Sequence, residues 1–226
     1  MGLNVSKGNM YPWINFTWNT VKGECPHGCK YCYMHKWGKL PPPHFDEKEF
    51  REFDKDMIKY GEGQFIFVGS SCDMFADDIP GEWIFKTLEH CKKFDNTYLF
   101  QSKNPKNFND VGLVQLNKII LCITLETNRV YPEIMRNAPD PVKRAIDFSH
   151  IPIEEKYITI EPIMDFDLES LVSMIRVNKP TQVNIGADSG NNDLPEPSQD
   201  KIEELFEELN VFTKVKLKAN LNRLIK

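Results

Sequence analysis

The sequence predicts an α/β fold: a partial (β/α)6 TIM-like barrel of parallel strands, with a candidate seventh strand at its edge. Short β-branched or aromatic runs, typical of buried parallel strands, alternate along the chain with longer helix-like segments. Six to seven such units in series favour a parallel sheet with right-handed crossovers. An open doubly wound sheet is the alternative. In both arrangements, function is expected at the carboxyl ends of the strands.

The expected strands follow one another at intervals that leave room for a helix between most neighbours. They cover residues 14–19, 64–69, 97–102, 118–125, 157–162 and 182–186, and residues 214–219 form the candidate edge strand. Helices are expected over 46–59, 81–92, 105–115, 139–147, 167–177 and 198–210. The last helix carries Ile202, Leu205, Phe206 and Leu209 on one face among glutamates, which is an amphipathic pattern. We therefore expect a single domain over residues 1–226, ending in this helix and a basic tail (198–226).

The composition indicates a globular protein with one sizeable core. The chain has 226 residues, of which 41% are hydrophobic and 27% charged, and its net charge is −5. This charge argues against a large basic field that would hold nucleic acid non-specifically. No apolar run reaches the roughly 18 residues of a membrane helix, and the first residues show no apolar signal-peptide region. We therefore expect a cytoplasmic protein with no membrane partner.

The strongest chemical signal is a cysteine loop, "GECPHGCKYCYMH" at 23–35, which follows the first expected strand. Cys25, Cys29 and Cys32 have the spacing C-x3-C-x2-C, and no second cysteine pair follows them. A cubane iron–sulfur cluster needs four ligands, and proteins usually give four cysteines. Three cysteines leave one iron open for an outside ligand, and an open position is typical of a catalytic metal.

Polar side chains follow the ends of the other expected strands. They are Ser71, Cys72 and Asp73 after the second strand, Lys103 after the third, Thr124 and Glu126 at the fourth, Glu161 at the fifth, Asp188 at the sixth and Lys218 at the candidate edge strand. A charge buried without a partner costs on the order of several kcal/mol. Carboxylates and lysines at one end of successive strands therefore indicate a polar site. The alternative is a set of helix caps and surface turns.

Taken together, these residues resemble the radical S-adenosylmethionine (SAM) superfamily. The cysteine loop, with Tyr31 as the aromatic residue before its last cysteine, follows strand one of a βα series. The chain is also similar to a narrower, phage- and bacteria-associated radical SAM group of largely unassigned function. The shared stretches are "TWN", "GCKYCY", "SSCDMFADDIP", "FQSKNP", "ITLET", "IEPIMDF" and "GADSG", over about residues 13 to 190. The chain departs from the superfamily in a short segment before Cys25 and in Ser70-Ser71-Cys72-Asp73, where many members have glycine-glycine-glutamate.

The resemblance implies an enzyme with a [4Fe-4S] cluster and SAM as cofactors. Cys25, Cys29 and Cys32 would hold three irons, and the amino and carboxylate groups of SAM would bind the fourth. Reductive cleavage of SAM would give a 5′-deoxyadenosyl radical that abstracts hydrogen from a substrate. A nucleobase, nucleoside or nucleic acid is the favoured substrate class, with a peptide or small metabolite left open. The expected partners are this substrate and a reductant such as flavodoxin or ferredoxin.

The resemblance also implies roles for the residues at the strand ends. Tyr31 would contact adenine, Ser71 and Asp73 would accept from the methionine ammonium, and Lys103 would meet the carboxylate. Thr124 and Glu126 would hold ribose hydroxyls, because a carboxylate can accept from two hydroxyl donors. Glu161, Asp188 and Lys218 would line the cofactor or substrate rim. Cys72 and Lys218 are the candidate catalytic residues, with Cys72 a candidate for hydrogen transfer.

Two other function classes stay open on the sequence. A non-catalytic protein would bind zinc or an inert cluster at the same loop, with His27 or His35 as a fourth zinc ligand. A nucleic-acid-binding module would use the basic tail "KVKLKANLNRLIK" against a phosphate backbone, although the acidic net charge argues against it. SAM cleavage by the reconstituted protein would exclude the first class, and a salt-dependent binding titration would test the second.

Overall fold

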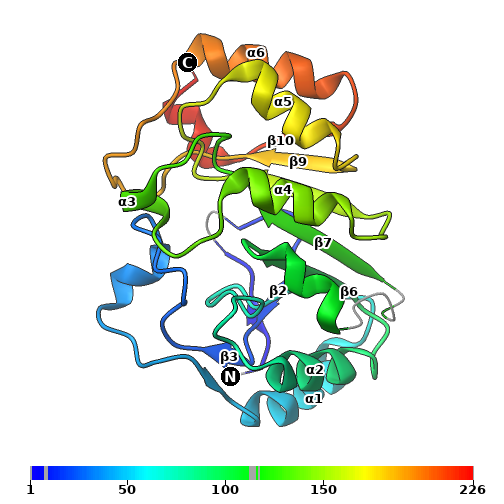
Figure 1. Ribbon diagram of the computed structural model, residues 1–226. Coiled ribbons are helices and arrows are strands. Elements are labelled where there is room, and N and C mark those ends of the chain that lie inside the picture. Colours follow the sequence, from blue (N-terminus) through cyan, green and yellow to red (C-terminus); the bar gives the residue numbers. More distant parts are fainter. Residues whose placement is uncertain (1, 8–9, 112–115, 117, 226) are drawn as a thin grey trace. The chain divides into compact units, whose positions relative to one another are not determined.

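The computed structural model describes residues 2–7, 10–111, 116 and 118–225 (Figure 1). The chain divides into two compact units. The first comprises Met1–His27 and Met34–Leu121, and the second comprises Gly28–Tyr33 and Cys122–Lys226. Each unit is described by itself below, and the single domain expected over 1–226 stays a prediction.

The first unit is built on a mainly parallel sheet with the strand order β1-β2-β5-β6-β7. Its strands are β1 (Asn4–Val5), β2 (Phe16–Trp18), β5 (Phe65–Val68), β6 (Thr97–Ser102) and the beginning of β7 (Ile119–Thr124). Neighbours β2, β5 and β6 pair in parallel, whereas β1 pairs antiparallel with β2. Most residues of β2, β5 and β6 are buried, as the apolar runs predict.

Two helices, α1 (Lys48–Tyr60) and α2 (Gly81–Cys91), pack on the first unit's sheet (Figure 1). Trp18 of β2 is fully buried, and its ring lies 4.4 Å from that of Phe53 on α1 and 5.6 Å from that of His90 on α2. This aromatic cluster forms much of the unit's core. A small antiparallel hairpin of β3 (Val21–Lys22) and β4 (His44–Phe45) brackets the stretch that contains the cysteine loop, and the 3-10 helix η1 (Tyr33–Trp37) follows the cysteines.

The second unit is built on the strand order β7-β8-β9-β10, with β8 (Lys156–Ile160), β9 (Gln182–Ile185) and β10 (Lys214–Leu217). Strands β8, β9 and β10 pair in parallel, and β10 is the last strand in the order. Its helices are α3 (Pro132–Met135), α4 (Pro141–Ser149), α5 (Leu168–Arg176) and α6 (Gln199–Asn210), followed by the 3-10 helix η4 (Ala219–Arg223). Asp140 caps α4, because its side chain accepts from the backbone N–H of Val142 at 2.7 Å.

The predicted α/β class with a parallel sheet is confirmed, including the seventh strand at the edge. The helix expected over 105–115 is a 3-10 helix, η2 (Pro105–Val111), and residues 112–115 lie outside the described part of the chain. The sequence analysis missed β1, the β3–β4 hairpin and α3. These are two-residue strands and a four-residue helix, too short for a periodic hydrophobic pattern to reveal them.

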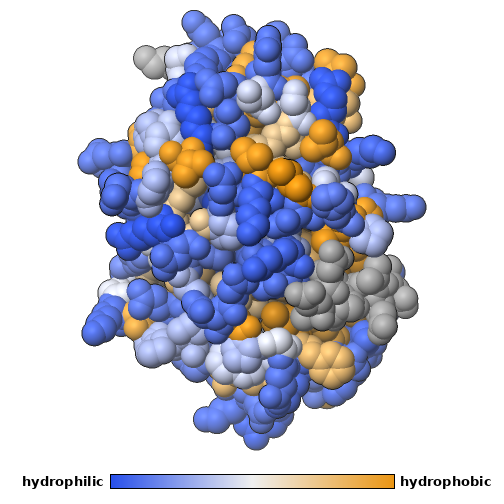
Figure 2. All heavy atoms as spheres, viewed as in Figure 1, coloured by the Kyte–Doolittle hydropathy of each residue, from blue (hydrophilic) through white to orange (hydrophobic). Residues whose placement is uncertain are grey.

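Across the described residues, no helix combines the length and the apolarity needed to cross a membrane. The face shown in Figure 2 is mostly hydrophilic, and hydrophobic side chains gather on it where α4 and α5 lie. Val142, Ile146, Met174 and Val177 line a shallow apolar groove between these two helices of the second unit. None of these four side chains is charged or carries a hydroxyl or thiol group, unlike the candidate residues at the strand ends.

Candidate functional site

Hydrogen bonds to Trp18 and Asn19, at the end of β2, hold the turn after β5 in place. Gly69 has a φ of 81°, which glycine adopts without strain, and its N–H donates to the carbonyl of Trp18 at 2.8 Å. The side-chain oxygen of Asn19 accepts from the backbone N–H of Ser71 at 2.9 Å and from the Ser70 hydroxyl at 3.2 Å. Asn19 therefore holds the turn that presents Ser71 at the carboxyl end of the strands.

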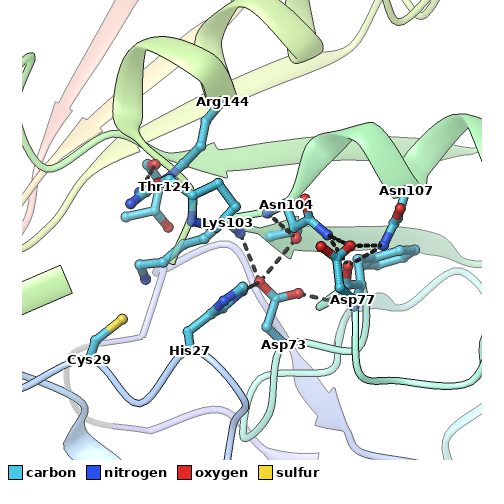
Figure 3. A network of polar contacts seen from close by, with 12 residues as sticks. His27, Cys29, Asp73, Asp77, Lys103, Asn104, Asn107, Thr124 and Arg144 are labelled. Atoms are coloured by element: carbon cyan, nitrogen blue, oxygen red, sulfur yellow. Dashed lines mark hydrogen bonds and ion pairs between the residues drawn. The ribbon is translucent and has the colours of Figure 1, made fainter. Parts of the chain in front are cut away.

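Asp73 is the centre of a buried polar network in the first unit (Figure 3). Its Oδ2 lies 2.8 Å from Nε2 of His27 and accepts from the Ser102 hydroxyl at 3.0 Å and the backbone N–H of Lys103 at 2.8 Å. Its Oδ1 accepts from the backbone N–H of Phe75 at 3.0 Å. Asp73 thus joins the turn after β5, the end of β6 and the first half of the cysteine loop.

The pKa values of this network favour a charged Asp73–His27 pair. Burial alone raises the pKa of Asp73, but the hydrogen bond and charge of His27, with the N–H groups of Lys103 and Phe75, lower it on balance. Burial alone lowers the pKa of His27, while the hydrogen bond and charge of Asp73 raise it above its ordinary value. The two side chains are only 6% and 9% exposed and lie at ion-pair distance, and both pKa shifts favour their charged forms.

Two asparagines support the loop that carries Asp73 (Figure 3). Asn104 donates to the carbonyl of Phe75 at 2.9 Å and to Asp77 at 2.8 Å. Asn107 donates to the same two groups at 2.9 and 3.2 Å. The "FQSKNP" stretch therefore contributes structural support, through Asn104, besides the candidate residue Lys103.

Cys25 and Cys72 lie in contact within the first unit. Both are free thiols, and Cys72 is buried. A hydrogen bond with the Cys72 side chain lowers the pKa of Cys25 to about 6, against the effect of burial, which raises it. A thiol with this pKa is largely thiolate at neutral pH, which is the form that binds metals.

The second half of the cysteine loop, Gly28–Tyr33, belongs to the second unit and is held by α3. The backbone N–H of Lys30 donates to the carbonyl of Ile134 at 2.9 Å. The Cys29 thiol lies 3.6 Å from the carbonyl of Met135 as a weak donor, and the N–H of Cys32 donates to the carbonyl of Cys29 at 3.1 Å. The short helix that the sequence analysis missed therefore shapes the loop with two of the three cysteines.

Glu126 and Arg144 form an ion pair in the interior of the second unit. Nη1 of Arg144 lies 2.6 Å from Oε2 of Glu126, and both side chains are 0% exposed. Arg144 also donates to the carbonyls of Thr124 at 2.9 Å and Pro139 at 2.6 Å, and the Tyr31 hydroxyl donates to Oε1 of Glu126. Burial and then the charge of Glu126 raise the pKa of Tyr31, so its hydroxyl stays protonated and remains a donor.

A second ion pair lies at the ends of β8 to β10. Nζ of Lys218 is 2.5 Å from Oε2 of Glu161, and these side chains are 8% and 18% exposed. The Asn220 amide donates to Oε1 of Glu161 at 2.9 Å and to the carbonyl of Ala187 at 2.6 Å. The structure thus brings together two residues that the sequence analysis placed on the substrate rim, and adds Asn220 to them.

Replacing Gly186 with alanine should destabilise the protein by about 1–3 kcal/mol, because the new Cβ would overpack this pair. It would lie 2.7 Å from Oε1 of Glu161 and 3.0 Å from Oδ1 of Asn220. Urea unfolding of the metal-free protein measures the effect. The matched control is Gly81→Ala at the start of α2, where an added Cβ meets nothing within 4 Å. Equal stability changes in the two variants would contradict the tight packing around Glu161.

Asp188 organises the loop after β9 instead of meeting Glu161 or Lys218 in the described contacts. It accepts from the backbone N–H groups of Gly190 at 2.9 Å and Asn192 at 2.5 Å, and from the Asn192 amide at 2.7 Å. Burial raises its pKa, but these donors lower it on balance. Its expected contact with the cofactor or substrate rim stays a prediction.

The donor set of the cysteine loop fits an iron–sulfur cluster. Cys25, Cys29 and Cys32 are free thiols, and they lie within eight residues of the chain. Among the described residues, no group of three or more His, Cys, Asp or Glu side chains is arranged to hold a metal ion. Cys25 belongs to the first unit and the other two cysteines to the second. His27, one of the two suggested fourth ligands for zinc, is instead paired with Asp73.

Four residues that hold strand ends or loops were assigned no role from the sequence: Asn19, Ser102, Arg144 and Asn220. For Arg144 a signal exists. The buried residues of α4 are Pro141, Arg144, Ala145 and Phe148, at the i, i+3, i+4, i+7 spacing of a core-facing stripe. An arginine on such a stripe predicts a buried acidic partner. Its partner, Glu126, was itself a candidate residue.

The fold and the strand-end residues define an α/β protein with a mainly parallel sheet and a candidate site at the carboxyl ends of its strands. Its cysteine loop comes after β2, the first parallel strand in the chain. The chain belongs to the protein family described as "Protein of unknown function (DUF5131)", whose model matches residues 9–200. The comparison with curated proteins gives no match.

Solved structures share the fold at low sequence identity. A spore photoproduct lyase variant with bound AdoMet and dinucleoside spore photoproduct matches with a TM-score of 0.68 and 10% identity, covering 92% of this chain and 78% of that one. Streptococcus suis SuiB bound to precursor peptide SuiA matches with a TM-score of 0.62 and 13% identity, covering 86% and 46%. Methylornithine synthase (PylB) matches with a TM-score of 0.54 and 14% identity, covering 88% and 63%. These similarities confirm the α/β partial-barrel fold class.

Proposed function

We propose that the protein is a radical SAM enzyme. The observation that carries this proposal is the C-x3-C-x2-C loop of free thiols after the first parallel strand of this fold. A structure that shares the fold over 92% of the chain is described with bound AdoMet. The proposed enzyme domain spans residues 1–226, and its reductant is a small electron-transfer protein such as flavodoxin or ferredoxin.

Cys25, Cys29 and Cys32 would hold the [4Fe-4S] cluster in this proposal. When bound, the cluster and SAM supply reductive cleavage to methionine and a 5′-deoxyadenosyl radical, which abstracts hydrogen from substrate. The lowered pKa of Cys25 supports ligation, because metal ligands bind as thiolates.

The chain's other residues would bind and orient SAM. Ser71, presented by the turn after β5, would accept from the methionine ammonium, with Asp73 as the buried charge behind that turn. The Lys103 side chain would meet the methionine carboxylate. Thr124 and Glu126 would hold ribose hydroxyls, because a carboxylate can accept from two hydroxyl donors. Tyr31 would present its ring or backbone to adenine.

The residues proposed to act on or orient the substrate are Cys72 in the first unit and Glu161, Asp188 and Lys218 in the second. Lys218 and Glu161 form a nearly buried ion pair with polar neighbours, which suits orientation of a polar substrate. Cys72 would supply or accept a hydrogen atom, and Asp188 would fix the neighbouring loop. We favour a nucleobase, nucleoside or nucleic acid as substrate, supported by the dinucleoside named for one structure of the same fold. The peptide named for another keeps that class as the alternative.

Reduced wild-type protein should produce 5′-deoxyadenosine from SAM, and Cys29→Ala should produce none. The protein is purified and reconstituted anaerobically with iron and sulfide, reduced with dithionite and mixed with SAM. The matched control is Cys122→Ala, which removes a fully buried thiol of β7 that the proposal does not use. It should retain iron and 5′-deoxyadenosine formation.

Two other results are informative. If a four-iron cluster forms without 5′-deoxyadenosine, the EPR signal of the reduced cluster decides. A change on adding SAM supports a substrate-gated enzyme, and an unchanged signal contradicts SAM binding. A protein that takes up zinc and no iron overturns the proposal in favour of a non-catalytic metal protein.

A further inference from the structure

We propose that Arg144 and Glu126 are positioning residues that act through Tyr31 to fix the second half of the cysteine loop. In this arrangement, called here the Arg144–Glu126–Tyr31 clamp, the buried ion pair sets the placement and accessibility of Cys29 and Cys32. The effect on iron retention rests on the proposed function, whereas the effect on the two thiols does not.

The clamp is anchored at Arg144 in the interior, and the constraint passes from there through Glu126 to Tyr31. Arg144 is held at three points, since it donates to the carbonyls of Thr124 and Pro139 as well as to Glu126. Oε2 of Glu126 is therefore bound to a group that cannot rotate away without breaking several hydrogen bonds. The remaining oxygen, Oε1, accepts from the Tyr31 hydroxyl. A bond to a buried carboxylate is charge-assisted and therefore stronger than one between neutral groups.

Tyr31 is well placed in the chain to transmit this constraint to the thiols. It lies two residues after Cys29 and directly before Cys32. Other anchors of this stretch include a backbone bond from Lys30 to Ile134 and the long contact of the Cys29 thiol with Met135. The Tyr31 hydroxyl adds a side-chain anchor that ends on a buried carboxylate.

Removing one atom, the hydroxyl oxygen of Tyr31, distinguishes the clamp from an ion pair that serves only global stability. Tyr31→Phe removes the hydroxyl and leaves the Glu126–Arg144 pair and its backbone bonds intact. A pair that served only global stability would leave the two cysteines unaffected by this change. A clamp predicts local release of the loop with the rest of the unit folded.

The first test uses metal-free, reduced, folded protein, so it needs no cluster. Iodoacetamide alkylation is followed by peptide mass spectrometry for each cysteine. In Tyr31→Phe, iodoacetamide should react with Cys29 and Cys32 several-fold faster than in the wild type. Cys29 is only 5% exposed in the clamped loop, so release of the loop should expose it. The core thiol Cys122 should react equally slowly in both proteins and reports any global unfolding.

The matched control is Tyr33→Phe, which removes the hydroxyl of a 48% exposed tyrosine in the same loop. Cys29 and Cys32 of this variant should be alkylated at the wild-type rates. The clamp is wrong if Cys29 and Cys32 of Tyr31→Phe are alkylated at the wild-type rates. It is also wrong if Tyr31→Phe and Tyr33→Phe accelerate their alkylation equally. Acceleration at Cys122 together with Cys29 would show global destabilisation and also count against it.

The second test uses the reconstituted protein and measures iron release to a ferrous chelator. Tyr31→Phe should release iron several-fold faster than the wild type and Tyr33→Phe, and Glu126→Gln should resemble Tyr31→Phe. If the wild type takes up no iron, the proposed function fails and the alkylation rates still decide the clamp. If all proteins release iron at one rate while alkylation differs, the clamp positions the thiols but does not govern iron retention, and that half of the proposal is wrong.

Discussion

Replacing Glu126 with glutamine should lower the free energy of unfolding by about 3–5 kcal/mol. The substitution leaves Arg144 as an uncompensated charge at a position that is 0% exposed. Among the described residues its Nη2 has no hydrogen-bond partner, and the other acceptors of Arg144 are neutral carbonyls that cannot replace the charge of the carboxylate. Urea unfolding of the metal-free protein, followed by circular dichroism, gives this value from the shift in midpoint at constant slope.

Two controls separate the buried pair from charge effects in general. Glu82→Gln breaks the exposed Glu82–Lys86 pair on α2, whose atoms lie 2.8 Å apart, and should leave the unfolding midpoint close to that of the wild type. Glu126→Leu combined with Arg144→Met removes both charges and should recover most of the loss, since an apolar replacement leaves no orphan charge. A Glu126→Gln variant no less stable than Glu82→Gln would contradict a charged pair in the interior.

Most of the fold could be predicted from the sequence because all its parallel strands except the edge strand β10 are largely buried. A buried strand needs an unbroken apolar run, and a helix on the sheet needs an apolar stripe, so "QFIFVG" and the 198–210 segment show their structure without knowledge of their partners. The elements that were missed have no such signature. Two-residue β3 and β4 exist because Val21 pairs with Phe45 across the cysteine loop, a contact that local sequence does not encode.

The candidate site was predictable in its membership but not in its connections. The order of the strands places Asp73, Lys103, Glu126 and Glu161 at strand ends, so the sequence identifies them. The sequence does not show that Asp73 accepts a hydrogen bond from the backbone N–H of Lys103, because that bond depends on how two loops pack together. Nor does it show that Glu126 is paired with a residue 18 positions later, on α4.

These connections explain why carboxylates are tolerated at this depth. Three of the acids singled out have a cationic partner, since Asp73 has His27, Glu126 has Arg144 and Glu161 has Lys218, whereas Asp188 accepts from backbone and amide N–H groups. Pairing offsets a desolvation cost that would otherwise neutralise the acids. In this arrangement the acids serve first to fix loops and strand ends.

Replacing Asp73 with asparagine should also cost about 3–5 kcal/mol at pH 7, because it breaks a buried ion pair. Oδ2 has three donors around it, from His27, Ser102 and Lys103, and an amide nitrogen in that place would set donor against donor. The oxygen that asparagine retains can serve only one side of this network.

The loss should depend on pH in a defined window. The folded pKa of Asp73 is lowered from an ordinary 3.8, so its contribution is full above that value and disappears as the pH falls through the folded pKa. The folded pKa of His27 is raised from an ordinary 6.5, so its contribution is full below that value and declines as the pH rises through the folded pKa. The stability difference between wild type and Asp73→Asn should therefore be greatest between about pH 4 and 6.5 and shrink on both sides.

Urea unfolding of the metal-free proteins from about pH 3 to pH 9 measures this profile. The matched control is Asp77→Asn, a carboxylate on the same loop that is 61% exposed and pairs with Lys106 at 3.0 Å. An exposed pair contributes at most about 1 kcal/mol, so its variant should differ little from wild type at any pH. A difference for Asp73→Asn that stays constant across this range would mean that the Asp73–His27 pair is not charged in the folded protein.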